Sequence, residues 1–220
     1  MTDKRRKTGR PTKIPGQKDT AEKIFDASID LFAQRGYDKV SVRDIAAAVG
    51  IKESSIYKHY TSKEAILQKI IQYPLAKIYT IAAREDTTEQ LITKMGLEGF
   101  ISETGTVFAN WMTDPKTIKI LRIVYIELYH NDQIMQSYAE LIDAGETFWT
   151  ATLSIMMKQG LIKASDPKLL AAEFLAFFWN LFTEYFLVQY GRTSSSFMEL
   201  YSDSLTRHIA YFMKTVGESK

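Results

Sequence analysis

The spacing of apolar and polar positions predicts helices along nearly the whole chain. From residue 19 to residue 35, apolar side chains recur at intervals of three and four, which is typical of a helix with one buried face. Asp19 or Thr20 can cap the start of this helix, and Gly36 can end it. This face is expected to serve packing alone.

Two short helices are expected next, separated by a glycine. Ser41 with Asp44 three residues later resembles a capping box, in which Asp replaces the usual Glu or Gln. Gly50 can supply the positive φ of a sharp turn. The sequence therefore predicts a helix-turn-helix arrangement.

The second of these short helices, at about residues 52–59, is the candidate recognition helix. Ile56 and Tyr60 are expected to point into the core. Short hydrogen-bonding side chains near a helix start are suited to base edges in a major groove. The residues expected to face outward are Lys52, Glu53, Ser54, Ser55, Tyr57, Lys58 and His59.

A fourth helix should begin after Ser62, which is a good cap. Lys63 then falls in the first turn, where a cation is normally disfavoured. A lysine there is easier to explain if it meets a phosphate, which a helix N-terminus also attracts. Pro74 should kink or end this helix.

The rest of the chain reads as helical, with no convincing alternating strand and no internal repeat. Further helices are expected at about residues 88–105, 108–112, 115–130, 134–160, 167–190 and 194–216. The segment Leu169–Val188 is apolar on more than one face and should be largely buried. Because the last helix has a wide apolar face too, we expect a second copy of the chain to cover part of this surface, giving a homodimer through the last two long helices.

Composition and charge add a partner and a compartment. The 220 residues include no cysteine, so disulfides are excluded, and no apolar run is expected to approach the roughly 20 residues that span a bilayer. We therefore expect a cytoplasmic protein without a membrane partner. Residues 1–72 contain 15 Lys and Arg against 9 Asp and Glu, a net charge of +6, within a chain whose net charge is +2. This basic first third suggests contact with a polyanion, although a chance surface imbalance would look the same.

The first 18 residues form a basic tail that is expected to be disordered. Its Gly9-Arg10-Pro11 run resembles the centre of an AT-hook, which would lay Arg10 in a narrow minor groove. The alternative is a nonspecific basic arm. Catalytic, cofactor and metal sites are not expected, because the three histidines are far apart and no phosphate loop or nucleophile elbow occurs.

Several short runs together resemble the DNA-binding region of the TetR/AcrR family of transcriptional regulators. The runs are Leu31-Phe32-Ala33-Gln34-Arg35-Gly36-Tyr37, Ser41-Val42-Arg43-Asp44-Ile45-Ala46, Val49-Gly50-Ile51, Ile56-Tyr57-Lys58-His59-Tyr60 and Ser62-Lys63-Glu64. The resemblance covers roughly residues 19–67. It implies an all-α fold in which the tail at 1–18 is followed by a three-helix helix-turn-helix DNA-binding domain at 19–67 and a larger ligand-binding and dimerisation domain at 68–220.

The resemblance also implies contacts with double-stranded DNA. Tyr57 and Lys63 would contact the backbone, Ser41 a phosphate, and Glu53 and Ser54 the bases. The full set of DNA-binding candidates is Ser41, Arg43, Lys52, Glu53, Ser54, Tyr57, Lys58, His59, Lys63 and Arg10. Glu53 departs from the family pattern, since an acid is repelled by phosphate; it would accept from a cytosine amino group or point away.

For a small-molecule effector, aromatic residues of the second domain are the candidates, with ordinary core packing as the alternative. They are Phe108, Trp111, Tyr125, Tyr129, Phe148, Trp149, Phe174, Phe178 and Phe182. Glu127, His130, Glu146, Asn180 and Glu184 lie in or beside apolar stretches. The acids among them would suit a cationic apolar ligand or would be solvated helix edges.

The sequence therefore predicts a ligand-responsive homodimeric repressor, released from a palindromic operator by a small apolar or amphipathic molecule. Two alternatives remain. One is an architectural DNA-binding protein with weak sequence preference and no ligand, and the other is a helical binding module that has lost its DNA function.

Overall fold

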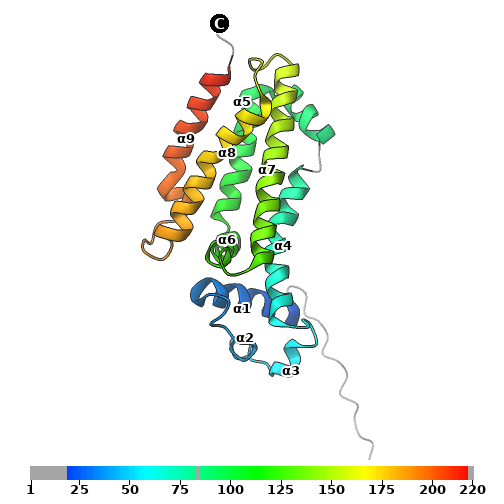
Figure 1. Cartoon of the computed structure of the whole chain (residues 1–220), viewed down its shortest axis with the longest axis vertical. Coiled ribbons are helices and arrows are strands. Elements are labelled where there is room, and N and C mark those ends of the chain that lie inside the picture. Colours follow the sequence, from blue (N-terminus) through cyan, green and yellow to red (C-terminus); the bar gives the residue numbers. More distant parts are fainter. Residues whose placement is uncertain (1–18, 83–84, 218–220) are drawn as a thin grey trace, which may run out of the picture.

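The computed structural model describes residues 19–82 and 85–217, and within these ranges the secondary structure is helical, apart from one isolated bridge between Tyr190 and Thr193 (Figure 1). The predicted all-α class is confirmed. The elements are α1 (Thr20–Arg35), α2 (Val42–Val49), α3 (Glu53–Ile56), α4 (Lys63–Ala82), α5 (Glu85–Thr113), α6 (Pro115–Glu127), α7 (Asp132–Lys158), α8 (Pro167–Thr183), a π-helical segment η1 (Glu184–Gln189) and α9 (Phe197–Val216).

The ends of α1 and α2 follow their capping residues. The Asp19 side chain accepts a hydrogen bond from the Glu22 amide, and the Glu22 side chain accepts one from the Asp19 amide. Gly36 ends α1 with φ +80°. Ser41 and Asp44 form the same reciprocal box at the start of α2. Local hydrogen bonding therefore determines these boundaries, as the sequence predicted.

The recognition helix is shorter than expected. Gly50 adopts the left-handed conformation, with φ 74° and ψ 34°, and Lys52 is the N-cap of α3 without a side-chain capping bond. Residues 57–59 form turns instead of continuing the helix, although the Tyr60 amide still bonds the Ile56 carbonyl at 3.0 Å. Ile56 and Tyr60, on either side of these turns, are both buried.

One hydrophobic core joins the first helices to the second part of the chain. Ile24, Phe32, Ile45 and Ile56 from α1 to α3 belong to the same buried cluster as residues of α4 and α6. The residues that α6 and α7 supply to this cluster are Ile120, Ile123, Val124 and Ile134. In Figure 1, α6 lies next to α1 where the two parts meet. The helix-turn-helix thus rests directly on α6.

Two backbone breaks differ from the prediction. The fourth helix does not end at Pro74, since α4 continues through it to Ala82. A proline removes one backbone hydrogen bond, and α4 as a whole packs against α1, α6 and α7. In α5 the helix runs through Gly105, where a break was expected, and the non-helical residue is Gly96, with φ 68°.

The outer helix α8 is less buried than its composition predicted. Phe174, Leu175, Leu181 and Phe182 face the interior against α7, but Leu169 is 55% exposed. The π turn η1 then keeps Tyr185 and Phe186 inside while leaving Leu187 and Val188 outside. In Figure 1, α8 and α9 form one side of the molecule. This side therefore presents an apolar surface.

By length and composition, residues Pro167–Gln189 would pass as a membrane span, contrary to the expectation that no apolar run was long enough. Their most apolar window has a mean hydropathy of 1.2, and 39% of that window is buried inside the protein. Since the inner face packs against α7 and α9, the composition of this helix is weak evidence for a membrane.

Candidate nucleic-acid interface and ligand core

The surface formed by α2 and α3 lies at one end of the molecule, with α3 outermost (Figure 1). Ile56 is fully buried and Tyr60 is 7% exposed, so both inward-facing predictions are confirmed. Arg43 is also exposed on α2. The exposed side chains of the predicted recognition face are Lys52, Glu53, Ser54, Tyr57, Lys58 and His59, with Ser55 half-buried beside them. The structure therefore brings these candidates onto one surface, and their contacts with DNA stay predictions.

Ser41 already uses its polar groups within the protein. Its amide donates to the Asp44 carboxylate at 2.8 Å, and its hydroxyl also bonds that carboxylate and accepts from the Asp44 amide. The hydroxyl bond is the main reason why the pKa of Asp44 lies below its usual value. A phosphate at Ser41 would have to share these donors with Asp44.

Lys63 does not extend freely from the start of α4. Its ammonium donates to the carbonyls of Tyr37 at 2.9 Å and Val40 at 3.0 Å, and lies 3.9 Å from the centre of the Tyr37 ring. An ammonium has three hydrogens, so one donor remains for a phosphate. Arg10, the remaining DNA candidate, lies outside the described residues.

Tyr37 is a residue that the sequence analysis did not single out. It lies between α1 and α2, it is 8% exposed, and its hydroxyl donates to the Glu64 carboxylate at 2.8 Å. Burial first, and then the bond to Glu64, raise the pKa of Tyr37. Nothing local in the sequence indicates the hydrogen bonds of Tyr37, because they join positions 26 to 90 residues apart.

Most of the predicted ligand residues meet in the interior of the second domain. Phe108 lies 5.2 Å from Phe178 between ring centres, Phe178 lies 5.2 Å from Phe174, and Trp149 lies 4.5 Å from Phe174. Phe148 and Phe182 extend this chain of rings at its two ends. These six side chains form the aromatic core.

Three candidates lie at the edge of this core or away from it. Tyr125 is buried against Phe186, and Trp111 packs on the same cluster. Tyr129, in contrast, is 92% exposed and joins none of these rings. It falls in the turn that follows Glu127, so the helical phase of α6 no longer directs it inward.

A polar pair borders the aromatic core. The hydroxyls of Tyr125 and Tyr138 are 2.9 Å apart, and burial raises the pKa of both. The indole nitrogen of Trp111 is buried and has no hydrogen-bond partner in the described part of the chain. The interior thus offers neutral hydrogen-bonding groups beside a large apolar surface.

The acidic candidates for a cationic ligand do not gather there. Glu127 bonds the Tyr37 amide, Glu184 lies in a groove on the outer side, and Glu146 is half-buried. His130 and Asn180 are exposed. The described contacts therefore give no support to a cationic ligand site.

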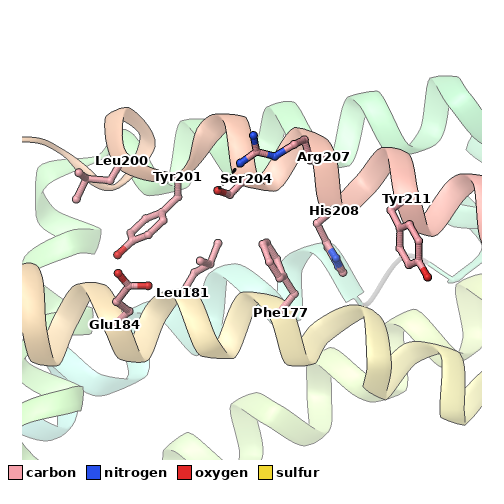
Figure 2. Close-up of a pocket in the computed structure, with 9 residues that line it drawn as sticks. All are labelled: Phe177, Leu181, Glu184, Leu200, Tyr201, Ser204, Arg207, His208 and Tyr211. Atoms are coloured by element: carbon pink, nitrogen blue, oxygen red, sulfur yellow. Dashed lines mark hydrogen bonds between the residues drawn. The ribbon is translucent and has the colours of Figure 1, made fainter.

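The groove that contains Glu184 runs between α8 and α9 (Figure 2). It is open to solvent and has a volume of about 530 Å³. In Figure 2, the Tyr201 hydroxyl points toward Glu184, and burial followed by this carboxylate raises the pKa of Tyr201 to about 12. His208 stacks on Phe177 with ring centres 4.2 Å apart, and burial lowers its pKa. Apolar and polar groups thus alternate along this groove.

The fold and the exposed polar side chains of α3 define the class of protein: a helix-turn-helix DNA-binding domain followed by a larger helical domain. Residues 24–70 match the family model for bacterial regulatory proteins of the tetR family, and residues 101–202 match the C-terminal domain of AefR-like transcriptional repressors. Together these matches span more than half of the chain. The protein belongs to the TetR family of transcriptional regulators.

Individual relatives resemble the chain in different ways. The negative transcriptional regulator IcaR of the biofilm operon icaADBC from Staphylococcus epidermidis is 43% identical over 51 residues, which are 23% of this chain and only 28% of IcaR. A putative TetR-family regulator from Mesorhizobium loti superposes with a TM-score of 0.65 at 20% identity, covering 90% of this chain and 96% of its own. SmeT in complex with triclosan superposes with a TM-score of 0.64 at 14% identity, covering 91% of this chain and 92% of its own. The solved structures therefore share the fold.

Proposed function

We propose that the protein is a homodimeric transcriptional repressor that binds a palindromic operator and is released by a small molecule. The observation that carries this proposal is the exposed polar face of α3, supported from behind by a buried Ile56. Two such faces in a dimer would enter successive major grooves about 34 Å apart. The repressing direction is supported by IcaR, which is named a negative regulator and matches in this region.

The effector that we propose is a small apolar or amphipathic molecule bound at the aromatic core. The rings from Phe108 to Trp149 offer an apolar surface, and the Tyr125–Tyr138 pair offers neutral hydrogen-bonding groups. The complex of SmeT with triclosan supports this class of ligand in the same fold. Such a molecule releases DNA only if it binds the DNA-free conformation more tightly than the DNA-bound one.

The dimer that we propose forms through α8 and α9, and the protein acts in the cytoplasm, where its operator is accessible. The groove between these helices is lined by Phe177, Leu181 and Leu200, and Leu187 and Val188 are exposed nearby. Exposed apolar side chains gathered on one side of a protein, with polar groups between them, are typical of an interface between subunits.

A footprint on the DNA upstream of its own gene, taken across a salt series, tests the proposal. A short protected palindrome that survives moderate salt is expected for a specific operator, and it supplies an assay for effectors. Broad protection that disappears as salt rises would contradict it and would favour the architectural alternative, because nonspecific binding depends mainly on counterion release.

A further inference from the structure

Glu127, the last residue of α6, projects into the turn between α1 and α2. Its Oε1 accepts a hydrogen bond from the Tyr37 amide at 2.9 Å, across 90 residues of sequence. The same oxygen lies 3.6 Å from the point where a Cβ would stand on Gly36. The carboxylate therefore packs directly over the backbone of this turn.

Both the side chain and the backbone of Glu127 are held in place. The residue is 5% exposed, and its carbonyl accepts from the amides of His130 and Asn131, each at 3.0 Å. Burying a carboxylate is costly unless hydrogen bonds compensate. No ion pair to Glu127 occurs among residues 19–82 and 85–217, which makes the Tyr37 amide its observed partner there.

Tyr37 connects Glu127 to the start of α4 through hydrogen bonds. Its amide is held by Glu127 of α6, its carbonyl by Lys63, and its hydroxyl by Glu64. Its ring packs edge-to-face with Phe32, at 5.3 Å between ring centres, and the Lys63 ammonium lies over it. One residue thus joins α6 to Lys63, the predicted phosphate contact at the start of α4.

We propose that Glu127 is a positioning residue for DNA binding, which acts through Tyr37 to hold the Lys63 ammonium where it can reach a phosphate. Lys63 follows the Tyr37 carbonyl, so a turn that loses its anchor would let the ammonium shift or become mobile. A hydrogen bond to a carboxylate is stronger than one to a neutral acceptor, which suits an anchor of this kind. The inference rests on the DNA-binding function proposed above.

The test compares Glu127→Met with Glu127→Gln in the full chain, bound to the footprinted operator and measured by fluorescence anisotropy. Methionine fills the space, but its thioether sulfur is only a weak acceptor for the amide, so operator affinity should fall about tenfold. Glutamine retains an acceptor oxygen and should recover affinity to within about threefold of the wild type. Lys119→Gln is the matched control, because it breaks the exposed contact from the same helix to Asp30 and should change affinity less than twofold.

A double-mutant cycle separates positioning from general damage. If Glu127 acts through Lys63, then Glu127→Met in a Lys63→Ala background should weaken binding by less than about twofold. Additive losses, or wild-type affinity in Glu127→Met, would overturn the inference while the wild-type operator complex stands. Failure of the wild type to bind DNA would instead overturn the proposed function, and this inference with it.

Hydrogen exchange in the unmodified protein gives a reading that does not depend on variants that fold. The Tyr37 amide should exchange far more slowly than the amides of exposed turn residues such as Lys58. Exchange at the rate of an exposed turn would show that the Glu127 bond is not formed in solution and would overturn the inference.

Discussion

At the scale of single residues, Lys63 has a structural role as well as a candidate role in DNA binding. Because its ammonium bonds two backbone carbonyls, Lys63→Ala should lower the free energy of unfolding by about 1–2 kcal/mol in the absence of DNA. Thermal and urea unfolding followed by circular dichroism would measure this loss. Lys58→Ala, which removes an exposed lysine from the same surface, should leave stability unchanged. Equal stability of both variants would show that the carbonyl contacts contribute nothing.

The same substitution should also change binding in a way that depends on charge. Removing one phosphate contact should weaken all DNA sequences similarly and reduce the slope of log K against log salt by about one. Anisotropy titrations at several salt concentrations, on the operator and on a scrambled duplex, would measure both effects. Glu53→Ala should leave the slope unchanged, and an equal reduction there would contradict the division of roles between these two residues.

Gly50 shows a second constraint at this scale. Its φ of +74° lies in the left-handed region, while no neighbouring atom would clash with an added Cβ. Gly50→Ala should therefore cost about 1–2 kcal/mol of stability through backbone strain alone. Unfolding of Gly50→Asn should show a smaller loss, since asparagine tolerates this conformation better. An alanine variant as stable as the wild type would mean that the turn adopts another conformation.

At the scale of elements, the capping boxes give the fold a dependence on pH. Hydrogen bonds from Ser41 to Asp44 and from Ser196 to Glu199 hold the pKa of both carboxyls below their usual values. A carboxyl with a lowered folded pKa stabilises the fold above its unfolded pKa, and this contribution is lost as pH falls through the folded value. The unfolding temperature should therefore decrease as the pH is lowered below about 4. The unfolding temperature of Asp44→Asn should decrease less than that of the wild type over the same pH range. If the two proteins show the same dependence on pH, the Asp44 cap has no role in it.

The elements also show what sequence can predict. Helix ends at Asp19, Ser41 and Gly50 depend on residues within four positions of one another, so they could be read directly. The π turn after Thr183 packs against the distant helix α6, and a local pattern of apolar residues contains neither this turn nor the passage of α4 through Pro74.

The same distinction holds for the candidate site. Helical phase correctly separated the inward Ile56 and Tyr60 from the exposed residues of α3. It failed for Tyr129, which lies beyond the helix end, and it gave no sign of the bond between Glu127 and Tyr37. Contacts between positions 90 residues apart become visible only when the chain is folded.

At the scale of the whole molecule, the outer side of α8 and α9 determines the expected assembly. Leu200→Glu places a charge in the groove beside Glu184, and burial of two nearby acids at an interface is costly. The dimer dissociation constant should rise at least about tenfold, as measured by analytical ultracentrifugation. Met135→Glu, at an exposed apolar position on α7, is the control and should leave the dimer intact. A dimer unaffected by Leu200→Glu would place the interface elsewhere.

The core shared between the first helices and α6 has a consequence for engineering. When DNA-binding domains are exchanged between regulators, the helix-turn-helix is treated as an interchangeable module. Here the core of that module is completed by Ile120, Ile123 and Val124, which lie more than 50 positions beyond residue 67. A graft that ends at residue 67 would therefore lack these contacts and would pack against the ligand-binding domain of another protein. A chimera built from this protein should therefore include the matching face of α6 together with the DNA-binding domain.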